Sequence, residues 1–91
     1  MFNSVYSEEL KIILKKLLKK DNKRYLQVMK KIQEIISQDE ISIMHYKNLR
    51  YDISDRKKVH IGKKFVLTFK YFIDKKTILF LKFGHRDDIY K

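Results

Sequence analysis

The sequence predicts an α+β fold in which two antiparallel N-terminal helices pack on one face of a mainly antiparallel sheet of about four strands. Apolar residues recur with a helical period up to residue 36, whereas from residue 57 onwards they recur at every second position. Helices and strands segregated in this way form a two-layer α+β structure. The length of 91 residues, without an obvious internal break, fits one domain spanning residues 1–91.

The first helix is predicted to follow a short strand, Phe2 to Tyr6. Ser7 is placed to cap its N-terminus, and Glu8 and Glu9 lie at the positive end of the helix dipole. The apolar stripe of this helix consists of Leu10, Ile13, Leu14, Leu17 and Leu18.

The second helix follows the polar cluster of residues 19–24, which is typical of a turn. Asp21 or Asn22 is its expected cap. Its apolar face carries Tyr25, Val28, Met29, Ile32, Ile35 and Ile36. Because the predicted turn is short, the two helices should lie antiparallel.

The segment after Gln38 has no clean period and contains turn-forming residues. It indicates an irregular connector anchored by Ile43, Leu49 and Ile53.

Period-two patterns then predict a hairpin with a tight turn at Gly62-Lys63. Its apolar face carries Val59, Ile61, Phe65, Leu67, Phe69 and Tyr71. Its opposite face carries Arg56, Lys58, His60, Lys64, Thr68 and Lys70. A second turn at residues 74–76 leads into the apolar strand Thr77 to Phe83, which we expect at the centre of the sheet because strands buried on both faces lose their alternation.

The chain is strongly basic, with 22 lysines and arginines, 11 aspartates and glutamates, and a formal net charge of +11. Residues 48–91 hold 12 basic and 5 acidic side chains, and so carry +7 of this excess. Such an excess in a small domain favours a polyanionic partner, and the alternative is a lysine-rich surface that serves solubility. On the basic hairpin face, these cations would hold several phosphates and leave room for bases to stack.

The composition also argues against several classes of protein. The sequence contains no cysteine, which excludes disulfides, thiolate nucleophiles and cysteine-based zinc sites and fits a reducing cytoplasm. There is neither a signal-peptide pattern nor an apolar run long enough to cross a bilayer, so we expect a cytoplasmic protein without a membrane segment. His45, His60 and His85 lie on different predicted elements without ligand spacing, so no metal site is expected.

The C-terminal half carries a more specific pattern, formed by Leu49-Arg50, Arg56 to His60, Gly62 to Thr68, Ile78 to Phe83 and Gly84-His85-Arg86…Ile89-Tyr90. This pattern resembles the C-terminal half of the RelE toxins of type II toxin–antitoxin systems, within the RelE/ParE superfamily. The N-terminal half agrees with that family in the order of its elements.

The resemblance implies a RelE-like fold and a metal-independent mRNA endoribonuclease that works without a cofactor in the ribosomal A site. It also implies an acidic RelB-like antitoxin that holds the toxin inactive in a toxin–antitoxin complex. The catalytic residues carried over are Arg86, Lys58, His60, Lys64 and Tyr90. Further RNA contacts are expected from Arg56, Thr68, Lys70 and His85.

The chemistry of RNA cleavage suggests a role for each of these groups. Arg86 and Lys64 suit the charge that develops on the phosphorane, and His60 suits proton transfer. Lys64 stands where the family has an arginine, and a lysine cannot form the same two-pronged contact with a phosphate. Tyr90 is expected to stack on a base, with Ile89 anchoring the tail.

Other interpretations remain open from the sequence alone. Gly84 is expected to bend the backbone sharply, so that His85 or Arg86 reaches the basic face. His85 could instead be an exposed tail residue, bond to Asp87 or Asp88, or act with His60. For the whole chain, the alternatives are a ParE-like toxin that blocks DNA gyrase and a non-catalytic RNA-binding domain, although ParE-like relatives generally lack the basic cluster.

Overall fold

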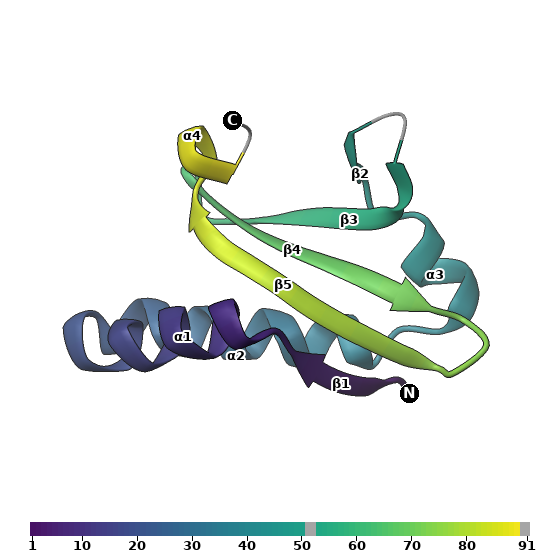
Figure 1. The fold of residues 1–91 in the computed structure, drawn as a ribbon, viewed down its shortest axis with the longest axis horizontal. Coiled ribbons are helices and arrows are strands. Elements are labelled where there is room, and N and C mark those ends of the chain that lie inside the picture. Colours follow the sequence, from purple (N-terminus) through teal and green to yellow (C-terminus); the bar gives the residue numbers. More distant parts are fainter. Residues whose placement is uncertain (51–52, 90–91) are drawn as a thin grey trace.

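The computed structural model describes residues 1–50 and 53–89, and their strands form one sheet with the order β1-β5-β4-β3-β2 (Figure 1). The strands are β1 (Asn3–Tyr6), β2 (Asn48–Arg50), β3 (Ile53–Ile61), β4 (Phe65–Phe72) and β5 (Thr77–His85). The helices are α1 (Glu8–Lys20), α2 (Asn22–Ile36), α3 (Glu40–Met44) and α4 (Arg86–Ile89). β1 pairs with β5 in parallel, and all other pairings are antiparallel.

The α+β class is confirmed, with α1 and α2 on one face of the sheet and α4 beyond the other face (Figure 1). The expected number of about four strands was too low, because β2 adds a fifth strand inside the predicted connector. Among the described residues, no helix is long and apolar enough to cross a membrane.

The two long helices begin at side-chain caps. The Ser7 hydroxyl accepts a hydrogen bond from the Leu10 amide at 3.0 Å, as the sequence predicts. Asp21 ends α1 by donating its amide to the Leu17 carbonyl, and starts α2 by accepting from the Arg24 amide. The turn is therefore Asp21 alone, not residues 19–24 as expected, because the lysines that flank it are good helix formers and extend both helices.

The core lies between these helices and one face of the sheet. Its buried members are Phe2, Leu10, Leu14, Val28, Ile32, Ile35, Ile36, Ile43, Ile61, Leu67, Phe69, Ile78, Phe80 and Phe83. Phe69 and Phe80 are fully buried with their ring centres 5.9 Å apart. The faces predicted from the alternation of the hairpin are thus confirmed for Ile61, Leu67 and Phe69.

The predicted irregular connector contains regular structure. Asp39 caps α3 by accepting from the Ser42 amide at 2.7 Å, and Ile43 from α3 enters the core. The buried Lys57 of β3 ties this segment down, because its Nζ donates to the Met44 carbonyl at 3.3 Å and to Asn48 Oδ1 at 2.5 Å. The Lys57 side chain thereby connects β3 with β2 and with the C-terminal end of α3.

We predict that Lys57→Ala lowers the free energy of unfolding by about 2 kcal/mol, because it leaves the Met44 carbonyl and the Asn48 amide oxygen without this donor. Urea unfolding followed by circular dichroism measures the change. Lys15→Ala is the matched control, since Lys15 is exposed on α1. Equal stability of the two variants would contradict the structural role of Lys57.

Lys57 should also make the free energy of unfolding depend on pH. Burial lowers the pKa of Lys57 below its ordinary value of 10.5, so the unfolded chain holds this proton more tightly than the folded chain. The stability of the wild type relative to Lys57→Ala should therefore rise as the pH increases through the lowered pKa towards 10.5. Urea unfolding of both proteins at a series of alkaline pH values measures this difference, and a constant difference would count against it.

Candidate nucleic-acid interface

The face of the sheet turned away from α1 and α2, here called the open face, carries three cross-strand rows. Residues of β3 and β4 that alternate with core residues must point to this face. The register of β3, β4 and β5 aligns Arg56 with Lys70 and Leu79, Lys58 with Thr68 and Lys82, and His60 with Val66 and Gly84. Side chains directly opposite each other in such rows have Cβ atoms about 5 Å apart, so each row is a contiguous surface.

A β-bulge in β5 creates the middle row. Thr68 pairs with Lys82, but the next residue, Phe69, pairs with Phe80, so that Leu81 is the extra residue. The Thr68 hydroxyl accepts from the Lys82 amide at 3.2 Å and donates to the Lys82 carbonyl at 3.5 Å. Phe80 and Phe83 can therefore both enter the core while Lys82 points to the open face. Bulges are common beside active sites for this reason.

The C-terminal helix α4 covers the end of the open face that carries the third row. The Arg86 amide donates to the Lys64 carbonyl at 2.8 Å, which joins α4 to the turn between β3 and β4. If Gly84 carried a Cβ atom, this atom would lie 3.8 Å from Cδ1 of Ile89. The Ile89 side chain therefore packs directly over Gly84, in the position expected for an anchor of the tail. The sharp bend predicted at Gly84 was wrong, because β5 continues to His85 and the chain turns only where α4 begins.

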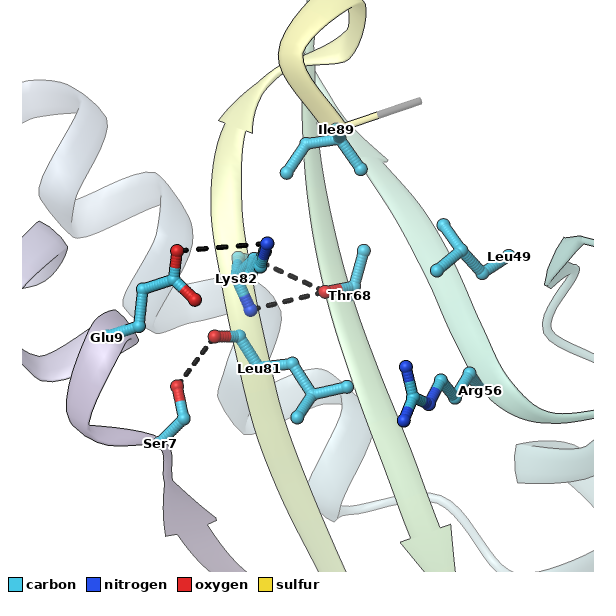
Figure 2. A pocket seen from close by; sticks show the side chains of 8 residues that line it. All are labelled: Ser7, Glu9, Leu49, Arg56, Thr68, Leu81, Lys82 and Ile89. Carbon is cyan, nitrogen blue, oxygen red and sulfur yellow. Dashed lines mark hydrogen bonds and ion pairs between the residues drawn. The ribbon is translucent and has the colours of Figure 1, made fainter. Parts of the chain in front are cut away.

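A pocket of about 200 Å³ opens between these parts (Figure 2). It is lined by Ser7, Glu9, Leu49, Arg56, Thr68, Leu81, Lys82 and Ile89. In Figure 2, Thr68 lies between β5 and β3, with Glu9 and Lys82 on one side and Leu49 and Arg56 on the other. The pocket thus combines aliphatic walls with two cations and one carboxylate.

The start of α1 reaches this pocket because it is joined to the bulge. The Ser7 amide donates to the Phe80 carbonyl at 2.9 Å, and the Ser7 hydroxyl donates to the Leu81 carbonyl at 2.6 Å. Two residues later, Glu9 Oε1 lies 3.8 Å from Lys82 Nζ. Both side chains are more than half exposed, so this ion pair is weak and a ligand can displace it at little cost.

The remaining predicted site residues lie around the rows in different environments. Lys58 is half-buried and His60 is exposed on β3, and the exposed Lys64 lies in the turn after β3. Lys70 is half-buried, with Nζ 5.3 Å from the centre of the Phe72 ring. The Arg86 side chain is 54% exposed, and its Nε lies 3.9 Å from Asp87 Oδ1. Tyr90 lies outside the described residues.

His85 does not join this surface. It pairs with Phe65, whose ring packs against the core on the helix side, and its own ring meets the Phe65 ring edge-on at 5.8 Å. Its Nδ1 accepts from the Asp87 amide at 3.2 Å, which agrees with the alternative that His85 bonds to Asp87. His60 and His85 therefore face opposite sides of the sheet and form no two-histidine site. Within the described ranges, no group of three or more potential ligands could hold a metal ion.

Sequence reasoning assigned no site role to five of the residues that line the pocket, namely Ser7, Glu9, Leu49, Leu81 and Lys82. Regular alternation from Phe80 sends Lys82 into the core, and a charge inside an apolar strand was the signal of a bulge. The position of Glu9 in the sequence indicates only a role at the helix dipole. Leu49 was assigned only an anchoring role, although it is half-buried and lines the pocket.

Comparison with known proteins gives the family. No protein-family model matches the chain. The chain is 46% identical to a Methanocaldococcus jannaschii protein described as "Putative toxin RelE4". This alignment of 79 residues covers 87% of this chain and 80% of that protein. The chain belongs to the RelE family of toxins. The RelE-family chain is also 33% identical over 82 residues to an uncharacterized Methanosarcina mazei protein, covering 90% and 91% of the two chains.

A solved structure agrees with the fold of this RelE-family chain. The crystal structure of YafQ from Escherichia coli strain BL21(DE3) superimposes with a TM-score of 0.73 and covers 100% of both chains. The two sequences are only 15% identical, so this likeness extends to the fold and not to individual residues.

We predict that Thr68→Val loosens the bulge, because a methyl group cannot replace either hydrogen bond to the Lys82 backbone. The free energy of unfolding should fall by about 1–2 kcal/mol, and the Lys82 amide should exchange its hydrogen faster. Amide exchange followed by NMR measures this effect. Thr77→Val is the control, because its hydroxyl donates only to an exposed turn carbonyl. Unchanged protection of the Lys82 amide would rule out the hydroxyl as the support of the bulge.

Proposed function

We propose that this protein is the toxin of a type II toxin–antitoxin module and that it inhibits translation by cleaving mRNA in the ribosomal A site without a metal ion. The observation that carries the proposal is the open face, where Arg56 and Lys82 line a pocket with aliphatic walls and Lys58 lies in the same cross-strand row as Lys82. Cations for phosphates beside apolar surface for bases are what a single-stranded RNA requires. Membership of the RelE family supports the same interpretation.

The middle row suits the phosphate at which cleavage occurs. Lys58 and Lys82 stand on either side of Thr68, roughly 10 Å apart at the backbone, which corresponds to two strand spacings. Their long side chains can converge on one phosphodiester above Thr68. Cations held at the position where negative charge develops usually make the largest single contribution to such a reaction.

Cleavage without a metal needs proton transfers as well as charge. The 2′-hydroxyl must lose a proton to attack its phosphate, and the departing 5′-oxygen must gain one. His60 is the histidine of the open face, and imidazole is the side chain best suited to proton transfer near neutral pH. Arg86, at the start of α4, is assigned to the phosphorane charge, and Tyr90 retains its predicted role of stacking on a base.

An acidic antitoxin is the proposed resting partner. The net charge of +11 favours a polypeptide of opposite charge. The outer faces of the described helices and of β1 also expose apolar side chains that a folded partner would cover, namely Val5, Ile12, Leu18 and Leu26. A RelB-like chain that combines acidic and apolar residues matches this surface.

A non-catalytic RNA-binding function is the second candidate. Two observations favour it: Lys64 stands at a family arginine position, and His85 faces the helix side of the sheet. Salt-sensitive RNA binding without cleavage, on or off ribosomes, would select this candidate.

We predict that Lys82→Gln slows mRNA cleavage on translating ribosomes by about 10- to 100-fold and relieves growth arrest, because it removes one of the two cations of the middle row. Lys15→Gln removes the same charge from the exposed surface of α1 and should leave cleavage unchanged. Primer extension on a translated message measures the cleavage. A parallel supercoiling assay with DNA gyrase tests the ParE-like alternative.

Cleavage by Lys82→Gln at the wild-type rate would remove Lys82 from the site. Inhibition of gyrase together with intact mRNA would overturn the proposed function itself.

A further inference from the structure

The pocket contains a carboxylate where an RNA-binding face would be expected to have none. Of the described residues that line it, Glu9 is the only acidic one, beside the cations Arg56 and Lys82. A negative charge here weakens the attraction for phosphates, so phosphate binding alone does not explain it.

The walls of the pocket fit a flat ligand with a polar edge. Leu49, Leu81 and Ile89 come from β2, β5 and α4, and Figure 2 shows them around the floor formed by Thr68. Guanidinium groups stack on the faces of unpaired nucleobases, and apolar side chains pack against a base that is held in a pocket. Aliphatic side chains offer a free phosphate neither charge nor hydrogen bonds. The apolar face of a base, in contrast, can pack against all three of them.

The edge of such a base would meet Glu9 and Lys82. These side chains lie 3.8 Å apart at one side of the pocket and present an acceptor next to a donor. Carboxylates in nucleic-acid interfaces accept hydrogen bonds from the exocyclic amino group of cytosine. Uracil carries a carbonyl oxygen at the same position of the ring, which a carboxylate repels.

We propose that Glu9 makes this pocket selective for a base with an exocyclic amino group, so that cytosine is bound in preference to uracil. The inference rests on the proposed function, because RNA must first reach the open face. It goes beyond that function by assigning a specificity residue from α1, a helix that carries none of the expected catalytic groups.

Glu9 also has a simpler role that must be separated from this one. Carboxylates in the first turn stabilise a helix through its dipole, and both Glu8 and Glu9 occupy that turn of α1. Glu8 is 88% exposed, pairs with Lys11 at 3.1 Å and does not line the pocket. Glu8→Gln therefore removes the same charge from the same turn and is the matched control for Glu9→Gln.

The test measures the binding of short, fluorescein-labelled 2′-O-methyl oligocytidylate and oligouridylate of equal length by fluorescence anisotropy. The 2′-O-methyl groups block cleavage, so that only binding is observed. The wild type should prefer the cytidine oligomer by about fivefold or more. In Glu9→Gln this ratio should fall close to one, because an amide can turn to present either a donor or an acceptor. In Glu8→Gln both affinities should rise together and the ratio should persist.

The ratio between the two oligomers is the decisive quantity. Equal binding of both oligomers by the wild type, or an unchanged ratio in Glu9→Gln, would overturn the inference while leaving the proposed function intact. If neither oligomer is bound and no mRNA is cleaved on ribosomes, the proposed function fails together with it.

Discussion

The bulge at Leu81 is the constraint on which both faces of the sheet depend. Phe80 and Phe83 both belong to the helix-side core, although three positions along a regular strand lead to the opposite face. The extra residue corrects this spacing, and the Thr68 hydroxyl holds it by bonding to the amide and the carbonyl of Lys82. The same hydrogen bonds therefore keep two aromatic rings in the core and one ammonium group on the open face.

Features encoded in short stretches of sequence could be predicted, and features that arise from distant contacts could not. The caps at Ser7 and Asp21 and the faces of the hairpin follow from residues only a few positions apart. The extra strand β2 exists only through its pairing with β3, which has no local signature. The short helix α3 is a different case, because Asp39 and Glu40 are a local start signal that its brevity obscured.

The candidate site shows the same difference between features encoded locally and features that arise from distant contacts. Period-two alternation is sufficient to predict that Arg56, Lys58 and His60 share one face of β3. Of these three, only Arg56 lines the pocket, and other lining residues come from separate elements: Leu49 from β2, Ile89 from α4 and Glu9 from α1. Glu9 reaches the pocket only because Ser7 bonds to the Leu81 carbonyl, 74 positions away along the chain. A period within one strand carries no information about such a contact.

The proposed RNA interface assigns affinity and selectivity to different structural elements. In the proposed function, the strands supply cations for the sugar-phosphate backbone, and such contacts position an RNA without reading its sequence. The start of α1 supplies Glu9, whose half-exposed ion pair with Lys82 adds at most about 1 kcal/mol to stability. Glu8 already gives α1 a carboxylate at its positive end, so helix stability does not require a second one at the pocket. The proposed recognition of a base edge therefore gives Glu9 a role that helix stability does not require.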